Sequence, residues 1–116
     1  MKKENPYEYL KTPCLEDVEP VDAQAAWTIT ESADETVTIY TSLLECGSWV
    51  YGYLVRWHNG RTSVQKPVAE LGLFASQREA KLYAVAFMLM YAEHFTAETR
   101  SLLYKAETSC QQSSLF

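Results

Sequence analysis

Few side chains in this sequence have the spacing that catalysis or metal binding requires. The histidines His58 and His94 lie far apart along the chain, and the sequence around Cys46 offers no histidine base that would activate it as a nucleophile. The three cysteines lack the close spacing of a zinc site or a disulfide framework. The acidic residues at 31–35 are typical of a solvated turn. We therefore expect no enzyme, no metal and no cofactor.

Basic residues are concentrated in the second half of an acidic chain. The formal net charge is −5, but residues 51–116 carry seven basic and only five acidic side chains. Cationic side chains bind nucleic-acid phosphates, so we expect a DNA-binding surface here. A plain solvated face, with local ion pairs to Glu70 or Glu79, is the alternative. The candidate DNA-binding residues are Arg56, Arg61, Lys66, Arg78 and Lys81.

The last residues form a second candidate site for a partner. The sequence Gln112-Ser113-Ser114-Leu115-Phe116 is similar to the Gln-x-Ser/Asp-Leu-Phe peptides by which bacterial proteins bind the replication sliding clamp. This resemblance implies that Leu115 and Phe116 fill an apolar pocket on the clamp and that Gln112 sets the register. The alternative is that Leu115 and Phe116 fold back on their own domain.

Alternating apolar and polar residues predict an antiparallel sheet in the first half of the chain. Residues 1–24 contain three prolines and many acids, and we expect an irregular lead-in there. Asn59-Gly60 accepts the positive φ angles of a tight hairpin turn, so the strands on either side of it should pair. The predicted strands are residues 26–30, 36–40, 48–57 and 61–66.

Helix signals follow the strands. Ser76 and Glu79 have the spacing of a capping box, which predicts a helix from Gln77 to about His94. Thr96 is a candidate cap for a second helical stretch to about Glu107, and the sequence leaves open whether the two are continuous. The predicted fold class is α+β, with a four-stranded antiparallel meander and one or two C-terminal helices packed on one face. Residues 25–108 would form one domain and residues 109–116 a flexible tail.

The strand at 48–57 places its large side chains on one face, because successive side chains alternate. These rings are either the core beneath the helix or an exposed platform on which unpaired bases stack. If they are core, the opposite face of the sheet, with Arg56, is open to a partner. The residues that share the aromatic face are Trp49, Tyr51, Tyr53, Val55 and Trp57.

The first predicted helix is apolar on nearly all sides between Leu82 and Ala92. Such a helix must be covered on two sides. The second helix and the lead-in would provide this cover within one chain, and a homodimer interface is the alternative. The same run is too short for a membrane-spanning helix, which needs about 20 apolar residues. With no signal peptide at its start, the chain is expected to be cytoplasmic and to have no membrane partner.

The stretch from Trp49 to Ala80 resembles the three-strand-plus-helix domains of plant AP2 factors and the arm-binding domains of tyrosine recombinases. The residues that carry this resemblance are Trp49, Gly60-Arg61, Gly72-Leu73-Phe74 and Ser76-Gln77-Arg78-Glu79-Ala80. The chain also resembles small proteins of phages and conjugative elements. These families read DNA with basic residues on the sheet, which implies that role for Arg56, Arg61 and Lys66.

Two functions are consistent with these patterns. The first is a non-enzymatic accessory protein that associates with nucleic acid, of a kind found in mobile elements, with a tail that recruits the clamp. The alternative is a dimeric protein–protein interaction module that does not bind nucleic acid.

Overall fold

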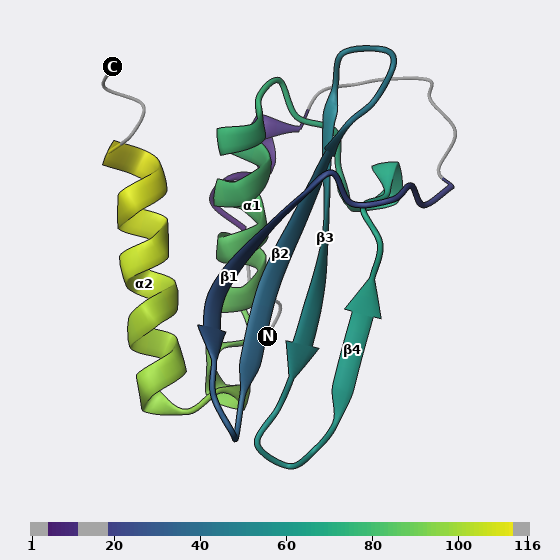
Figure 1. The fold of residues 1–116 in the computed structure, drawn as a ribbon. Coiled ribbons are helices and arrows are strands. Elements are labelled where there is room, and N and C mark those ends of the chain that lie inside the picture. Colours follow the sequence, from purple (N-terminus) through teal and green to yellow (C-terminus); the bar gives the residue numbers. More distant parts are fainter. Residues whose placement is uncertain (1–4, 12–18, 113–116) are drawn as a thin grey trace.

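The computed structural model describes residues 5–11 and 19–112 and has the predicted α+β architecture (Figure 1). The sheet is antiparallel and each strand pairs with the next along the chain, in the order β1-β2-β3-β4. Both helices follow the sheet in sequence. The strands are β1 (Ala25–Glu31), β2 (Thr36–Leu43), β3 (Trp49–Arg56) and β4 (Thr62–Gln65), and the helices are α1 (Gln77–Leu89) and α2 (Ala97–Gln112), with short 3-10 turns η1 (Glu8–Leu10), η2 (Ala69–Leu71) and η3 (Ala92–His94).

The turn between β3 and β4 has the predicted chemistry. Gly60 has a φ of 86°, which a side chain would strain. The Trp57 N–H donates to the carbonyl of Arg61 at 2.8 Å, and Asn59 Oδ1 accepts from the Arg61 N–H at 2.9 Å. The strands therefore pair as predicted.

The two helices are separate, and their ends differ from the predicted ones. The Ser76 hydroxyl accepts from the Glu79 N–H at 3.1 Å, so α1 begins where the capping box predicts. α1 ends at Leu89 rather than near His94, and this break allows Phe95 to enter the core, where it is 4% exposed. α2 continues to Gln112, so residues 109–112 are helical and do not belong to a tail.

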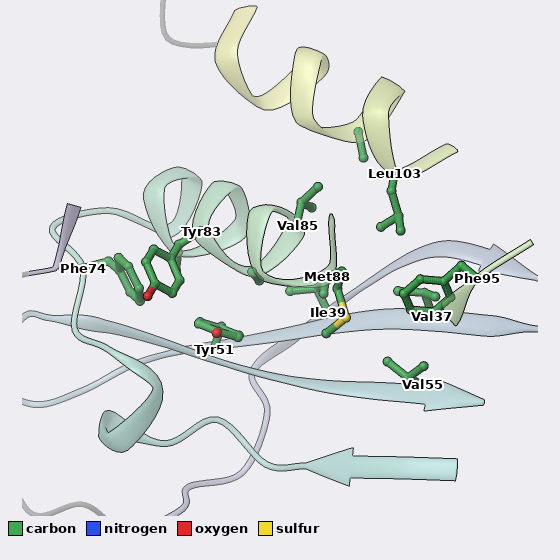
Figure 2. Close-up of a cluster of buried hydrophobic side chains, with 13 residues drawn as sticks. Val37, Ile39, Tyr51, Val55, Phe74, Tyr83, Val85, Met88, Phe95 and Leu103 are labelled. Carbon is green, nitrogen blue, oxygen red and sulfur yellow. The ribbon is translucent and has the colours of Figure 1, made fainter. Parts of the chain in front are cut away.

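The core lies between the sheet and the helices (Figure 2). α1 packs on β2 and β3, and α2 packs on α1 and β1. Tyr51 and Val55 of β3 point toward α1 and are almost fully buried, while Leu103 reaches the cluster from α2. The prediction that the aromatic face is core is confirmed, with the partly buried Trp49, Tyr53 and Trp57 packed at its margin.

The opposite face of the sheet is partly covered, whereas the sequence predicts that it is open. Val50 on that face is fully buried. The chain after β4 crosses β3 so closely that a Cβ on Gly52 would lie 2.2 Å from the Gln65 carbonyl oxygen. The Val21 N–H donates to the carbonyl of Pro67 at 2.8 Å, which joins the lead-in to this crossing. The face is partly covered because two irregular segments pack on it.

Other parts of the same chain cover α1. α2 contacts one side of it, and η1 contacts it near Tyr83, whose hydroxyl donates to Glu8 Oε2 at 2.8 Å. The intramolecular alternative for the cover of this helix is therefore confirmed. Within the described ranges, no helix is both long and apolar enough to cross a membrane.

Candidate functional site

The five basic residues proposed to bind DNA lie in three different places. Two of these residues, Arg56 and Lys66, lie on the outer side of the sheet, which faces away from the helices. Arg56 holds the β1–β2 turn, because its guanidinium donates to the carbonyls of Ser32 at 2.8 Å and Ala33 at 3.1 Å. Lys66 forms an ion pair with Asp22 at 3.1 Å. The outer cations therefore already have partners within the chain.

Arg78 and Lys81 lie on the helix side, between β1 and the end of α2. The Arg78 guanidinium donates to the Cys110 carbonyl at 3.3 Å, which satisfies a carbonyl in the last turn of α2. The Lys81 ammonium lies 5.3 Å from the ring centre of Trp27, a cation–π distance. Arg78 and Lys81 line a cavity of about 260 Å³ together with Gln77. Their contacts within the chain account for their positions without a bound phosphate.

Arg61 differs from the other four candidates. Its guanidinium has no hydrogen bond or ion pair with any described residue. Arg61 lines a concave site of about 450 Å³ at the end of the β3–β4 hairpin. We call this site the polar pocket. The polar pocket is lined by Trp57, His58, Asn59, Arg61, Glu93 and His94.

His58 is held in this pocket by a buried carboxylate that sequence reasoning placed on a solvated turn. Glu35 is only 1% exposed, and its Oε2 lies 3.1 Å from His58 Nδ1. Its Oε1 accepts from the hydroxyls of Thr96 at 2.8 Å and Thr99 at 2.6 Å, just before and within the first turn of α2. The expectation of a solvated acidic turn is therefore wrong for Glu35.

The partners of Glu35 keep it ionised. Burial desolvates the carboxylate and opposes ionisation, but hydrogen bonds from Thr99, His58 and Thr96 outweigh burial and lower the pKa of Glu35 from 4.5 to about 2. An ionised carboxylate only accepts hydrogen bonds, so Nδ1 of His58 carries the proton in this contact. Glu35 therefore fixes the orientation of the His58 ring.

A second, apolar pocket adjoins the polar one. It has a volume of about 190 Å³ and lies between β3, the start of β4 and the end of α1. Tyr91 on its rim is 47% exposed, which is unusual for a large ring beside a core. We call this site the apolar pocket, and its lining is Tyr53, Val55, Trp57, Ser63, Phe87, Met88, Tyr91, His94 and Phe95.

The free edge of β4 borders the apolar pocket. Among the described residues, no strand pairs with β4 on the side away from β3. Trp57 and Arg61 form a hydrogen-bonded pair, so by antiparallel alternation Ser63 and Gln65 bond to β3. Thr62 and Val64 then direct their N–H and C=O groups to the free edge. Figure 1 shows β4 on the side of the molecule opposite α2.

The proposed clamp-binding tail lies largely outside the description. Gln112 is the last residue of α2 and is exposed. Leu115 and Phe116 fall outside the described residues, so their role stays a prediction.

In the described part of the chain, no three metal-ligating side chains gather. No family model, no curated protein and no solved structure matches this chain. Its function is therefore inferred from the arrangement of its side chains.

Proposed function

We propose that this protein is a non-catalytic interaction module that binds an extended peptide segment of another protein. The segment adds a strand to the free edge of β4 and inserts one large apolar side chain into the apolar pocket. The observation that carries this proposal is the position of that pocket, which opens beside an unpaired strand on the helix side of the sheet.

The backbone of β4 supplies the affinity in this proposal. Thr62 and Val64 offer two N–H donors and two C=O acceptors to an incoming strand. An added strand satisfies such groups by main-chain hydrogen bonds, and pockets beside the edge select its alternate side chains. Ser63 points to the helix side and leaves room over β4 for the inserted side chain.

A foreign peptide explains the pocket better than a second copy pairing through β4. Two copies joined edge to edge would place Ser63 and Gln65 of each β4 on the helix side. These small or polar side chains do not fill an apolar pocket whose lining includes Phe87 and Met88. A peptide fills this pocket when a bulky apolar residue occupies a position whose side chain points to the helix side.

Nucleic-acid association is the competing proposal, and it has less support. Four of its five candidate cations have intramolecular partners, which leaves Arg61. Binding that depends on phosphate contacts weakens steeply with salt. Single-stranded and duplex oligonucleotides at two salt concentrations therefore form a second arm of the test.

The test is a selection of short random peptides displayed on phage against the full chain. We expect enriched peptides to share one large apolar residue within an extended, strand-forming sequence. In NMR titrations, these peptides should shift the amide resonances of Thr62 and Val64. Failure to enrich any binder, or shifts confined to residues far from β4, would contradict the proposal.

A matched pair of variants separates edge binding from other modes. Val64→Pro removes the N–H that faces the free edge, whereas Val64→Ala removes the side chain and keeps the N–H. Val64 is 61% exposed, and proline is tolerated at strand edges, so both variants should fold. We expect the proline variant to bind selected peptides about tenfold more weakly than the alanine variant, since one or two hydrogen bonds are lost. Equal affinities would exclude strand addition at β4.

A further inference from the structure

We infer that the bound peptide carries an anionic side chain two positions from its apolar anchor, on the same face of the strand, and that Arg61 in the polar pocket recognises it. This inference rests on the proposed function. It specifies the peptide class, which the apolar pocket alone does not determine.

The two pockets are neighbours with a shared wall. Trp57 and His94 line both of them. Because side chains alternate along a strand, a peptide whose anchor fills the apolar pocket directs the side chain two positions nearer the β3–β4 turn toward the polar pocket. If the peptide runs antiparallel to β4, the residues after the anchor lie there, because β4 itself leads away from that turn.

The polar pocket contains a cationic side chain with no charged partner among the described residues. The Arg61 guanidinium has no partner among the described residues, and the Arg61 side chain is exposed. The planar guanidinium matches a carboxylate or a phosphate by two parallel hydrogen bonds. The backbone N–H of Arg61 is bonded to Asn59 Oδ1, which ties the residue to the turn.

A second observation points to a missing acceptor in the shared wall. The indole Nε1 of Trp57 is buried and has no hydrogen-bond partner in the described structure. A buried donor without an acceptor is costly, and such groups mark places where a ligand or a water completes the structure.

Two carboxylates lie near the polar pocket, and they differ in their expected effect on a bound anion. Glu35 lies behind His58 and is already bonded to it. Glu93 lines the polar pocket, and its carboxylate is 3.9 Å from His94 Nε2. Glu93 therefore opposes an incoming anion while Arg61 attracts it. Removal of the Glu93 charge should raise the preference for anionic peptides, and removal of the Arg61 charge should lower it.

The experiment uses one peptide from the selection, synthesised in four versions. The residue two positions from the anchor is Gln, Glu, Ser or phosphoserine, and the positions before and after the anchor are tested in two separate series of four. We expect the wild-type protein to bind the Glu or phosphoserine version about five- to tenfold more tightly than its neutral counterpart, which is just below the range of a charge-assisted hydrogen bond because Arg61 is exposed to solvent. Preference for phosphoserine alone would identify a phosphorylated partner, and preference for both would identify an acidic one.

Variants of the pocket provide the control. Arg61→Gln should lose the preference for the anionic versions over their neutral counterparts. Glu93→Gln should enlarge the preference for the anionic versions. Equal binding of neutral and anionic versions by the wild-type protein would overturn this inference and leave the proposed function intact. Val64→Pro, by contrast, should weaken all four versions alike.

Discussion

Glu35 Oε2 accepts a hydrogen bond from Nδ1 of His58 at 3.1 Å, across 23 positions of sequence. Glu35 follows the β1–β2 turn, and His58 lies in the β3–β4 turn. The same carboxylate binds Thr96 and Thr99 at the start of α2. One buried anion thus joins the end of the β1–β2 turn, the β3–β4 turn and the start of α2, so the position of His58 in the polar pocket depends on Glu35.

Replacement of this carboxylate should destabilise the whole domain. In Glu35→Gln, an amide replaces the acceptor of four donor groups, and one of its two ends becomes a donor. We expect the free energy of unfolding to fall by about 3 kcal/mol at neutral pH, which is the linkage equivalent of the lowered pKa. Urea denaturation followed by tryptophan fluorescence measures this value. An unchanged unfolding midpoint would contradict a structural role for Glu35.

The same variant tests the pH dependence of stability. Because the pKa of Glu35 falls from 4.5 to about 2 on folding, its contribution is present above pH 4.5 and is lost as the pH falls toward 2. The difference in unfolding free energy between wild type and Glu35→Gln should therefore shrink over this interval. Other carboxylates titrate in both proteins and cancel in the difference. A difference that is constant from neutral pH to pH 2 would show that Glu35 is not ionised in the fold.

Gly52→Ala should displace the segment that follows β4. The added Cβ would lie 2.2 Å from the Gln65 carbonyl oxygen and 2.5 Å from Pro67 N, which are backbone atoms that cannot rotate away. We expect a loss of about 1–3 kcal/mol in the free energy of unfolding, as for overpacked core sites. Gly47→Ala is a useful comparison, because nothing lies near its Cβ and only its positive φ opposes alanine. A smaller loss for Gly52→Ala than for Gly47→Ala would argue against the close crossing.

Ser76→Ala should weaken the start of α1. The hydroxyl accepts from the Glu79 N–H at 3.1 Å, and its removal leaves that donor without its cap. We expect the free energy of unfolding to decrease by about 1 kcal/mol. Ser76→Asp keeps an acceptor at the cap and should retain most of the stability. Thermal unfolding of the three proteins, monitored by circular dichroism, compares them directly.

The clamp hypothesis can be tested independently of the pockets. Deletion of Leu115 and Phe116 should abolish co-elution with a bacterial sliding clamp, since these residues would fill the clamp pocket. Peptide binding at β4 should be unaffected, because Gln112 ends α2 on the side of the molecule opposite β4 (Figure 1). Absence of co-elution by the intact protein would show that the motif is coincidental.

The elements themselves could be predicted from local sequence. The Asn59-Gly60 turn and the Ser76 cap occur where their residue types require them, because turn and cap geometry involves residues only a few positions apart. The end of α1 could not be predicted, since the sequence stays apolar past Leu89. The break occurs there because Phe95 packs against Trp57, with ring centres 6.2 Å apart.

The candidate site was only partly visible in the sequence. Arg61 was singled out for its charge, and it lines the polar pocket. The sequence shows no partner for His58 and predicts that Glu35 belongs to a solvated turn. No local signal joins them, because the hydroxyl partner of Glu35 on Thr99 lies 64 positions away.

The sequence by itself determined which segments are strands and helices and which side chains of β3 share one face, because side-chain periodicity and caps act over short distances. The tertiary structure alone decided that this aromatic face is core, which charges are neutralised and where the two pockets lie. Arg56 illustrates the difference: its charge is evident in the sequence, but the carbonyls of Ser32 and Ala33 that bind it come close only when β1, β2 and β3 pair.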